Sequence, residues 1–432
     1  MSPRTNWCRC TSCHAGYGWK DDNFDFSEQN NMDCLVCHEQ SGKYKKFPTA
    51  CGHPAYEEKN FGGKVFEPVD LNAVAKTVGK PGLQNCGVCH FFGGGGGGVK
   101  HGDLDSSLLS ADRDLDVHMS KEGANHTCTA CHTTINHQMA GRYYTEKAPL
   151  EHSMAMPEDY GNRISCESCH GSTPHETMTI LDDHTAKVSC QACHIPRYAR
   201  GGISTLMWWD WSTAGKFTED CKPIVEKNEN GRPTYHTMKG DMTWAENVVP
   251  TYAWYNGGME YVTIKDTLPK DGSVEINRPL GSYDDPESRI FPFKYYEGRQ
   301  IYDAGANRLV YSKLFGPKGS GAYWSDYDWQ RSVEIGMAES GEEFSGQIGF
   351  IDTAMYWPIT HMVAPKEDSL QCAACHARDG RLASLPGFYL PGRDRVSWID
   401  TVGWSLFVLS IIGVMIHGLL RVVFRMARSK KQ

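Results

Sequence analysis

The sequence has no excess of positive charge, because 44 Lys and Arg stand against 52 Asp and Glu and the formal net charge is −8. Proteins that bind nucleic acids usually present a basic surface, so this balance argues against that class.

The start of the sequence also lacks an apolar run, since Met1 to Trp7 contain nothing like the core of a signal peptide. The glycine run from Gly93 to Gly98 is followed by no Lys-Ser or Lys-Thr pair. It therefore predicts a flexible loop and not a phosphate-binding one.

Cysteine is what the sequence has in abundance, with 17 residues. Fourteen of them form seven pairs with two residues between the partners, and a histidine follows each pair directly. In chain order, motifs 1 to 7 consist of Cys10, Cys13 and His14; Cys34, Cys37 and His38; Cys86, Cys89 and His90; Cys128, Cys131 and His132; Cys166, Cys169 and His170; Cys190, Cys193 and His194; and Cys372, Cys375 and His376. The remaining cysteines are Cys8, Cys51 and Cys221.

This spacing is typical of covalent haem attachment. Two thiols separated by two residues add to the two vinyl groups of one haem, and the adjacent histidine becomes an axial ligand of its iron. Zinc ribbons need two cysteine pairs for each metal ion and no histidine after every pair, and disulfide frameworks would not repeat a histidine at a fixed offset. The sequence therefore predicts a c-type cytochrome with haem c as cofactor, seven by motif count.

A second set of histidines is available as ligands on the other side of the irons. Eleven of the 18 histidines lie outside the motifs, and low-spin haems commonly take a second histidine. We expect axial ligands among His101, His118, His137, His175, His184 and His361. The pairing with individual haems stays open, because such ligands often come from remote segments.

The motifs divide the chain unevenly. Residues 1–200 hold six of them, at intervals that leave room only for loops and short helices. Residues 201–396 hold the last motif at 372–376 and predict a cover with short strands, such as 261–264 and 308–311, that either walls off a site or is purely structural. The expected fold is a mainly irregular and α-helical multihaem cytochrome c fold with the haem cluster as its core.

The C-terminal region predicts a membrane anchor. From Val402 to Leu420 the chain is apolar and uncharged, which is long enough to span a bilayer as a helix. We expect a transmembrane helix over 397–424 and a basic cytoplasmic tail over 425–432, which places residues 1–396 on the periplasmic face of the bacterial inner membrane. His417 lies inside this span; it faces a partner subunit, contacts a membrane-bound haem, or is a tolerated interfacial residue.

The segments around the motifs resemble the octahaem tetrathionate reductase family of c-type cytochromes. The similarity covers about residues 8–376 and is carried by the stretches 9–20, 33–38, 42–48, 89–96, 99–103, 193–196, 208–215 and 364–367. The family has eight haems, so the resemblance implies that an eighth motif and an export signal are missing before Cys10; a true seven-haem variant is the alternative.

The resemblance also implies a mechanism. Most haems relay electrons, and one haem has a lysine ligand and binds substrate on its open side. That lysine corresponds to Lys45 or Lys46, at the haem of motif 1 or else of motif 2. Cys51 follows this pair, and a free thiol there could exchange with a sulfur substrate; a buried inert thiol, or a disulfide of Cys8 with Cys51, are the alternatives.

The function that the resemblance implies is a membrane-anchored oxidoreductase that reduces tetrathionate, nitrite or hydroxylamine. Its electrons would come from the quinol pool through a cytochrome b-type or other quinol-linked membrane partner. A conduit with two histidine ligands on every haem, or the reverse oxidation, are alternatives. The protein's part is to position and tune the haems, since the redox chemistry belongs to the cofactor.

Overall fold

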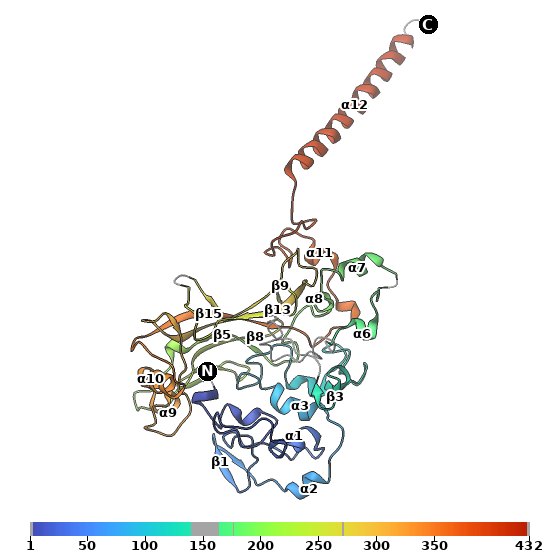
Figure 1. The fold of residues 1–432 in the computed structure, drawn as a ribbon. Coiled ribbons are helices and arrows are strands. Elements are labelled where there is room, and N and C mark those ends of the chain that lie inside the picture. Colours follow the sequence, from blue (N-terminus) through green and yellow to red (C-terminus); the bar gives the residue numbers. More distant parts are fainter. Residues whose placement is uncertain (1–2, 140–163, 176, 270–271, 430–432) are drawn as a thin grey trace. The chain divides into compact units, whose positions relative to one another are not determined.

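The computed structural model describes residues 3–139, 164–175, 177–269 and 272–429. It divides into two compact units, Met1–Leu370 and Gln371–Gln432 (Figure 1). The last motif therefore belongs to the C-terminal unit, together with the long apolar helix, and each unit is described by itself.

The motifs fold into short helical turns. Motif 1 lies on the 3-10 turn Thr11–Cys13, and the others form helices of four to eight residues. These helices are α1 (Cys34–His38), α3 (Leu83–His90), α4 (Cys128–Cys131), α6 (Glu167–His170), α8 (Cys190–His194) and α11 (Cys372–Cys375). Helices this short are marginal alone, so they depend on what packs around them. This confirms the prediction that the motif-rich region contains loops and short helices.

Other short elements link the motif helices in the first 200 residues. They are α2 (Leu71–Ala75), α7 (Thr179–His184) and the hairpins of β1 (Lys59–Phe61) with β2 (Lys64–Phe66) and of β3 (Thr134–Ile135) with β4 (Gln138–Met139). Apolar clusters in this part are small. One contains Val36, Tyr44 and Val74, and another contains Phe91 and Leu108 with neighbours.

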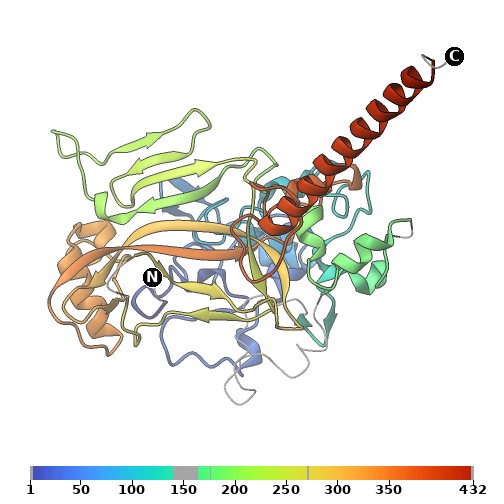
Figure 2. The ribbon, with the colours of Figure 1, turned by 90° about the horizontal axis from the view of Figure 1, so that it is seen from above.

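The second part of the N-terminal unit is built on a nine-stranded mixed sheet, seen from above in Figure 2. Its order is β11 (Val274–Glu275), β15 (Ile348–Pro358), β13 (Arg289–Asp303), β5 (Thr205–Asp210), β8 (Gly240–Ala245), β7 (Pro233–His236) and β6 (Val225–Lys227), and β9 (Thr251–Tyr255) and β14 (Arg308–Leu309) also pair with β13. β13 and β15 run antiparallel from the pair Phe293–Pro358 to the pair Asp303–Ile348. This sheet is much larger than the short strands that the sequence predicted.

Three further elements complete this unit. They are a hairpin of β10 (Met259–Tyr261) with β12 (Asn277–Pro279), and the helices α9 (Tyr323–Asp326) and α10 (Trp329–Glu339). Asp328 caps α10 by accepting from the backbone of Arg331. Val333 and Met337 of α10 are buried with Ile301 of β13, which fixes the helix to the sheet.

The C-terminal unit contains α11 and the helix α12 (Ser397–Ser429). α12 has a mean hydropathy of 2.3 over its most apolar window, none of that window is buried, and by length and composition it could cross a membrane. It begins where the predicted span begins and extends further than the predicted end at residue 424. The predicted basic tail falls partly on residues 430–432, which lie outside the described residues.

Candidate haem-ligand sites

The helical turn of each motif prepares it to hold one flat ligand. Residues three apart lie on the same face of a helical turn, so the two thiols of a motif point in one direction. The motif histidine follows at the end of the turn, within reach of the same face. The chemistry of this donor set fits covalent haem attachment with one axial imidazole.

Thiols of different motifs also approach one another. The thiols of Cys13 and Cys89, of Cys86 and Cys128, and of Cys166 and Cys190 lie close enough to shift each other's pKa. Burial raises the pKa of Cys37 and the neighbouring Cys86 raises it further, while burial and then Cys169 raise the pKa of Cys131. Motifs 1, 3, 4, 5 and 6 therefore follow one another in space in this order, with motif 2 beside motif 3.

Four motif histidines face a second imidazole. The pairs of ring centres are His38–His137 at 6.2 Å, His170–His118 at 6.1 Å, His132–His361 at 6.4 Å and His194–His175 at 6.3 Å. A metal–imidazole bond is about 2 Å long, so two imidazoles that bind one iron from opposite sides have ring centres roughly 6 Å apart. The spacing of all four pairs thus fits haems with two histidine ligands.

The second ring nitrogens support this assignment. Nδ1 of His14 faces the backbone oxygen of Thr11, Nδ1 of His38 lies 3.0 Å from the oxygen of Gly79, and within the C-terminal unit Nδ1 of His376 lies 3.1 Å from the oxygen of Pro391. A carbonyl oxygen only accepts, so Nδ1 carries the proton and donates. Nε2 is then left with a free lone pair, as a metal ligand requires.

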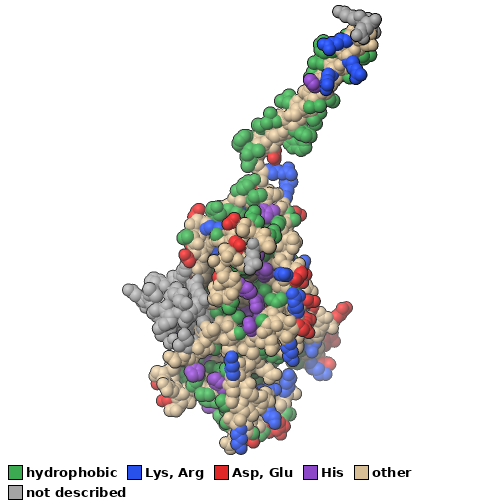
Figure 3. All heavy atoms as spheres, turned by 90° about the vertical axis from the view of Figure 1, so that its right-hand side faces the viewer, with side chains coloured by type: hydrophobic (Ala, Val, Ile, Leu, Met, Phe, Trp, Pro, Cys, Tyr) green, Lys and Arg blue, Asp and Glu red, His purple; other side chains and the backbone are tan. Residues whose placement is uncertain are grey.

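The predicted second ligands are placed as follows. His118, His137, His175 and His361 each lie opposite a motif histidine, and His118 also stacks on His126 at 6.5 Å. His101 is tilted against Trp357 at 6.2 Å, and Nδ1 of His184 faces the oxygen of Ile180 at 2.7 Å. Ligation by any of them stays a prediction. Histidine side chains also reach the surface at several places on the face shown in Figure 3.

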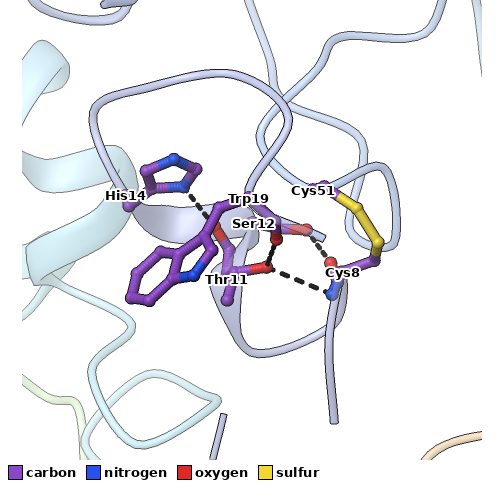
Figure 4. The surroundings of a disulfide bond; sticks show 6 residues. All are labelled: Cys8, Thr11, Ser12, His14, Trp19 and Cys51. Carbon is purple, nitrogen blue, oxygen red and sulfur yellow. Dashed lines mark hydrogen bonds between the residues drawn. A yellow bond between two sulfur atoms is a disulfide. The ribbon is translucent and has the colours of Figure 1, made fainter. Parts of the chain in front are cut away.

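Motif 1 has different surroundings (Figure 4). The ring of His14 lies edge-on to Trp19 at 5.2 Å and to Phe24 at 5.5 Å. Its Nε2 is buried without a hydrogen-bond partner among the described residues. A buried nitrogen of this kind is costly unless something binds it, which fits a metal ligand.

Cys51 is joined to Cys8 by a disulfide, also drawn in Figure 4. The prediction of a free, exchangeable thiol at Cys51 is therefore wrong, and the alternative pairing is the one that forms. The Thr11 hydroxyl accepts from the backbone N–H of Cys8 at 3.1 Å, so the disulfide holds the turn of motif 1.

Of the two lysines that the resemblance implies as a ligand, Lys45 is exposed, whereas Lys46 makes an ion pair and two hydrogen bonds. Nζ of Lys46 lies 3.1 Å from Asp33 and donates to the backbone oxygens of His14 at 2.7 Å and Gly16 at 2.9 Å. The Asp33 side chain is fully buried. Because Lys46 bonds to Asp33 and also to the backbone of His14 and Gly16, it ties the loop after motif 1 to the residue that caps the helix of motif 2. Lys46 would have to leave these partners to bind an iron.

Two further lysines were missed from the sequence. Nζ of Lys100 lies 4.4 Å from the centre of the Trp357 ring, and burial lowers its pKa. Lys294 of β13 is completely buried, where its Nζ donates to the backbone oxygen of Val99 and to the Thr205 hydroxyl, and burial lowers its pKa to about 7. The only signal in the sequence was a lysine inside the apolar stretch that became β13.

Comparison with known proteins places the chain beside cytochromes c. The family described as bacterial cytochrome c matches residues 206–379, and the family of outer membrane cytochromes MtrC/MtrF-like, domains II/IV, matches residues 6–180. An uncharacterized protein of Archaeoglobus fulgidus is 28% identical over 137 residues, which span 30% of this chain and 45% of that protein.

A solved structure is similar over most of the chain. The octaheme cytochrome c of Shewanella oneidensis is 39% identical, with a TM-score of 0.75 over 89% of this chain and 80% of that one. Haem c is thus the cofactor of this fold, and the paired histidines and cysteine motifs are the groups that would hold it. The chain belongs to the family of multihaem c-type cytochromes that includes this octaheme protein.

Proposed function

We propose that the protein is a membrane-anchored multihaem oxidoreductase that reduces a small oxidised sulfur or nitrogen compound. The observation that carries the proposal is a difference among the motif histidines. Four of them face a second imidazole, whereas within the described residues the rings of His14 and His90 have none opposite them at this spacing. Closed haems suit electron relay, and a haem with an open side suits substrate binding.

The order of the motifs supports a route for electrons. Haems held by motifs 6, 5 and 4 would be neighbours in space, followed by motif 3 and then by motif 1. Haem c supplies the one-electron chemistry when bound. The order rests on which attachment cysteines lie near one another in the fold, since the same sulfur atoms would become thioether links to haem.

The resemblance implies Lys45 or Lys46 as the lysine ligand; Lys45 is exposed, so Lys46 is the candidate from that pair, and the structure adds Lys100. A lysine binds iron only as the neutral amine, and burial favours that form. Lys46 is close to His14 but is held by Asp33. Lys100 lies near motif 3 instead. Burial lowers the pKa of His90, the histidine of that motif, and the charges of His132, His361 and Lys100 lower it further. The lysine-ligated haem would thus be that of motif 1 with Lys46, as the resemblance suggests, or that of motif 3 with Lys100.

The test compares two matched variants, Lys46→Met and Lys100→Met, in full-length protein in detergent. Ferric protein is examined by EPR for a high-spin signal, and each variant is assayed with tetrathionate, nitrite and hydroxylamine under a strong reductant. The lysine that ligates a haem produces a new high-spin signal and a change in turnover when replaced, while the other variant behaves like wild type. A wild-type protein that reduces none of the three compounds and binds neither carbon monoxide nor cyanide contradicts the proposal.

That last result would favour the second candidate, an electron conduit without catalysis. The four histidine pairs support it directly, because such haems are closed to ligands. The reverse reaction, oxidation that feeds quinone, uses the same sites and differs only in the potentials.

The membrane part of the proposal rests on α12. An uncharged apolar stretch followed by Arg421, Arg425 and Arg428 fits a single span with its C-terminal end in the cytoplasm. The haem-bearing residues would then lie on the periplasmic side, and a quinol-linked membrane partner would deliver electrons. A protease-protection assay on membrane vesicles tests this topology.

A further inference from the structure

The opposing histidines differ in what their Nδ1 atoms contact. His175, opposite the histidine of motif 6, donates from Nδ1 to Asp182 at 2.9 Å. His361, opposite the histidine of motif 4, has Nδ1 at 3.3 Å from Asp103 and at 3.1 Å from the Thr360 hydroxyl. In the motif histidines His14, His38 and His376, Nδ1 contacts a neutral backbone oxygen instead. A carboxylate is therefore placed behind two specific ligands.

Both carboxylates are held in place by other bonds. Asp182 also accepts from the backbone N–H of His175 at 3.1 Å, and its side chain is 12% exposed. Asp103 accepts from the backbone of Thr360 at 2.7 Å and of His361 at 3.0 Å, and its side chain is 1% exposed. Its second oxygen, Oδ1, has no hydrogen-bond partner among the described residues.

A carboxylate behind a ligating imidazole has a definite electronic effect. It pulls the Nδ1 proton toward itself, so the ring becomes a stronger donor through Nε2 and stabilises the more oxidised metal. Burial strengthens this effect, because fewer water molecules screen the negative charge. Removing the charge should therefore raise the reduction potential of the haem that the imidazole binds.

We propose that Asp182 and Asp103 are positioning residues that lower the reduction potentials of the haems of motifs 6 and 4, relative to the haem of motif 5 between them. At motif 5, whose histidines His118 and His170 form the pair, no carboxylate is bonded to either ring within the described residues; the buried Asp116 acts on His118 through its charge alone, because it accepts from backbone N–H groups. Electrons that pass along motifs 6, 5 and 4 would thus meet low, high and low potentials in turn. This inference depends on the paired ligation and holds for an enzyme and for a conduit alike.

The ring planes make the two classes of haem distinguishable. The carboxylate-supported pairs are nearly parallel, at 13° for His175–His194 and 24° for His132–His361. The pair at motif 5 is inclined at 65°, and the pair of His38 with His137 at 80°. Low-spin ferric haems with nearly parallel imidazoles give rhombic EPR signals, whereas nearly perpendicular imidazoles give signals with one very large g value.

The experiment is an EPR-monitored redox titration of the full chain carrying Asp182→Asn. Asparagine keeps an acceptor oxygen for the ring and removes the charge, so fold and ligation are preserved. One rhombic signal should titrate at a more positive potential, while the large-g signals keep theirs. The matched control is Asp183→Asn, which removes an exposed charge from the next residue of α7 and should leave all potentials in place.

Asp103→Asn repeats the test at an independent site, with Asp105→Asn as its control. Asp105 is equally buried but bonds to Ser107 and not to an imidazole. The proposal is overturned if the rhombic signals of both aspartate variants keep wild-type potentials, or if each control shifts them as much as its partner. A failure of substrate reduction would leave these shifts untouched, so the two proposals fail separately.

Discussion

Lys294, which is buried and bonds to the backbone of Val99 next to Lys100, offers a quantitative test of the structure. Its ammonium lies inside β13 with a pKa of about 7, and its two hydrogen bonds fix Val99 and Thr205. Val99 precedes Lys100, so this buried lysine positions the segment that carries one of the two candidate ligands. Replacement by methionine removes the titrating group and keeps a side chain of similar length.

The sign follows from proton binding. Lysine has a pKa of about 10.4 in an unfolded chain, so between pH 7 and that value the unfolded chain binds more protons than the folded one. Stability therefore rises with pH in this window, by up to about 1.4 kcal/mol per pH unit. From pH 7 to pH 9 the wild type should gain about 2 kcal/mol relative to Lys294→Met.

The assay is urea unfolding of both proteins in detergent at pH 7, 8 and 9, followed by near-ultraviolet circular dichroism. The free energy of unfolding of the wild type minus that of the variant should increase steadily with pH. In this difference, the contributions of all groups that titrate alike in the two proteins cancel. A difference that is constant across the three pH values refutes a buried lysine with a depressed pKa.

Three further predictions follow from other contacts. His361→Gly should open the haem of motif 4, giving one additional high-spin haem per chain that added imidazole restores. His236→Gly, on β7 and bonded to the backbone of Met238, should leave the EPR spectrum unchanged. Cys8→Ser should lower the free energy of unfolding by about 4 kcal/mol, because the disulfide closes a loop of 43 residues. Cys221→Ser, which replaces an exposed free cysteine, should have no effect on thermal unfolding. Equal melting temperatures for the wild type and both variants would contradict the structure. Removal of residues 397–432 should move the protein from the membrane to the soluble fraction with its haem spectrum intact, and continued membrane association would argue against α12 as the anchor.

Local features of the structure could be predicted from the sequence, because the information for them is local. The motif cysteines fix a helical turn within four residues, and α12 is defined by the uncharged apolar run from Val402 to Leu420. Both follow from spacing or composition alone.

The rest depends on contacts between remote segments. His132 and His361 are 229 positions apart, and no pattern along the chain links them. The disulfide of Cys8 with Cys51 was one alternative among several, and choosing it required the fold. The large sheet was underestimated because β13 contains Pro292 and Gly298 within its 15 residues, which interrupt a simple strand pattern.

The central claim is that this chain holds a haem at each of its seven motifs, and intact mass spectrometry under denaturing conditions tests it most directly. Noncovalent ligands are lost under these conditions, whereas haem joined through two thioether bonds stays on the chain. We predict a mass equal to the polypeptide plus seven haems, with Cys8 and Cys51 still linked by their disulfide. The mass of the bare polypeptide, or of a chain carrying fewer than seven haems, would contradict the account.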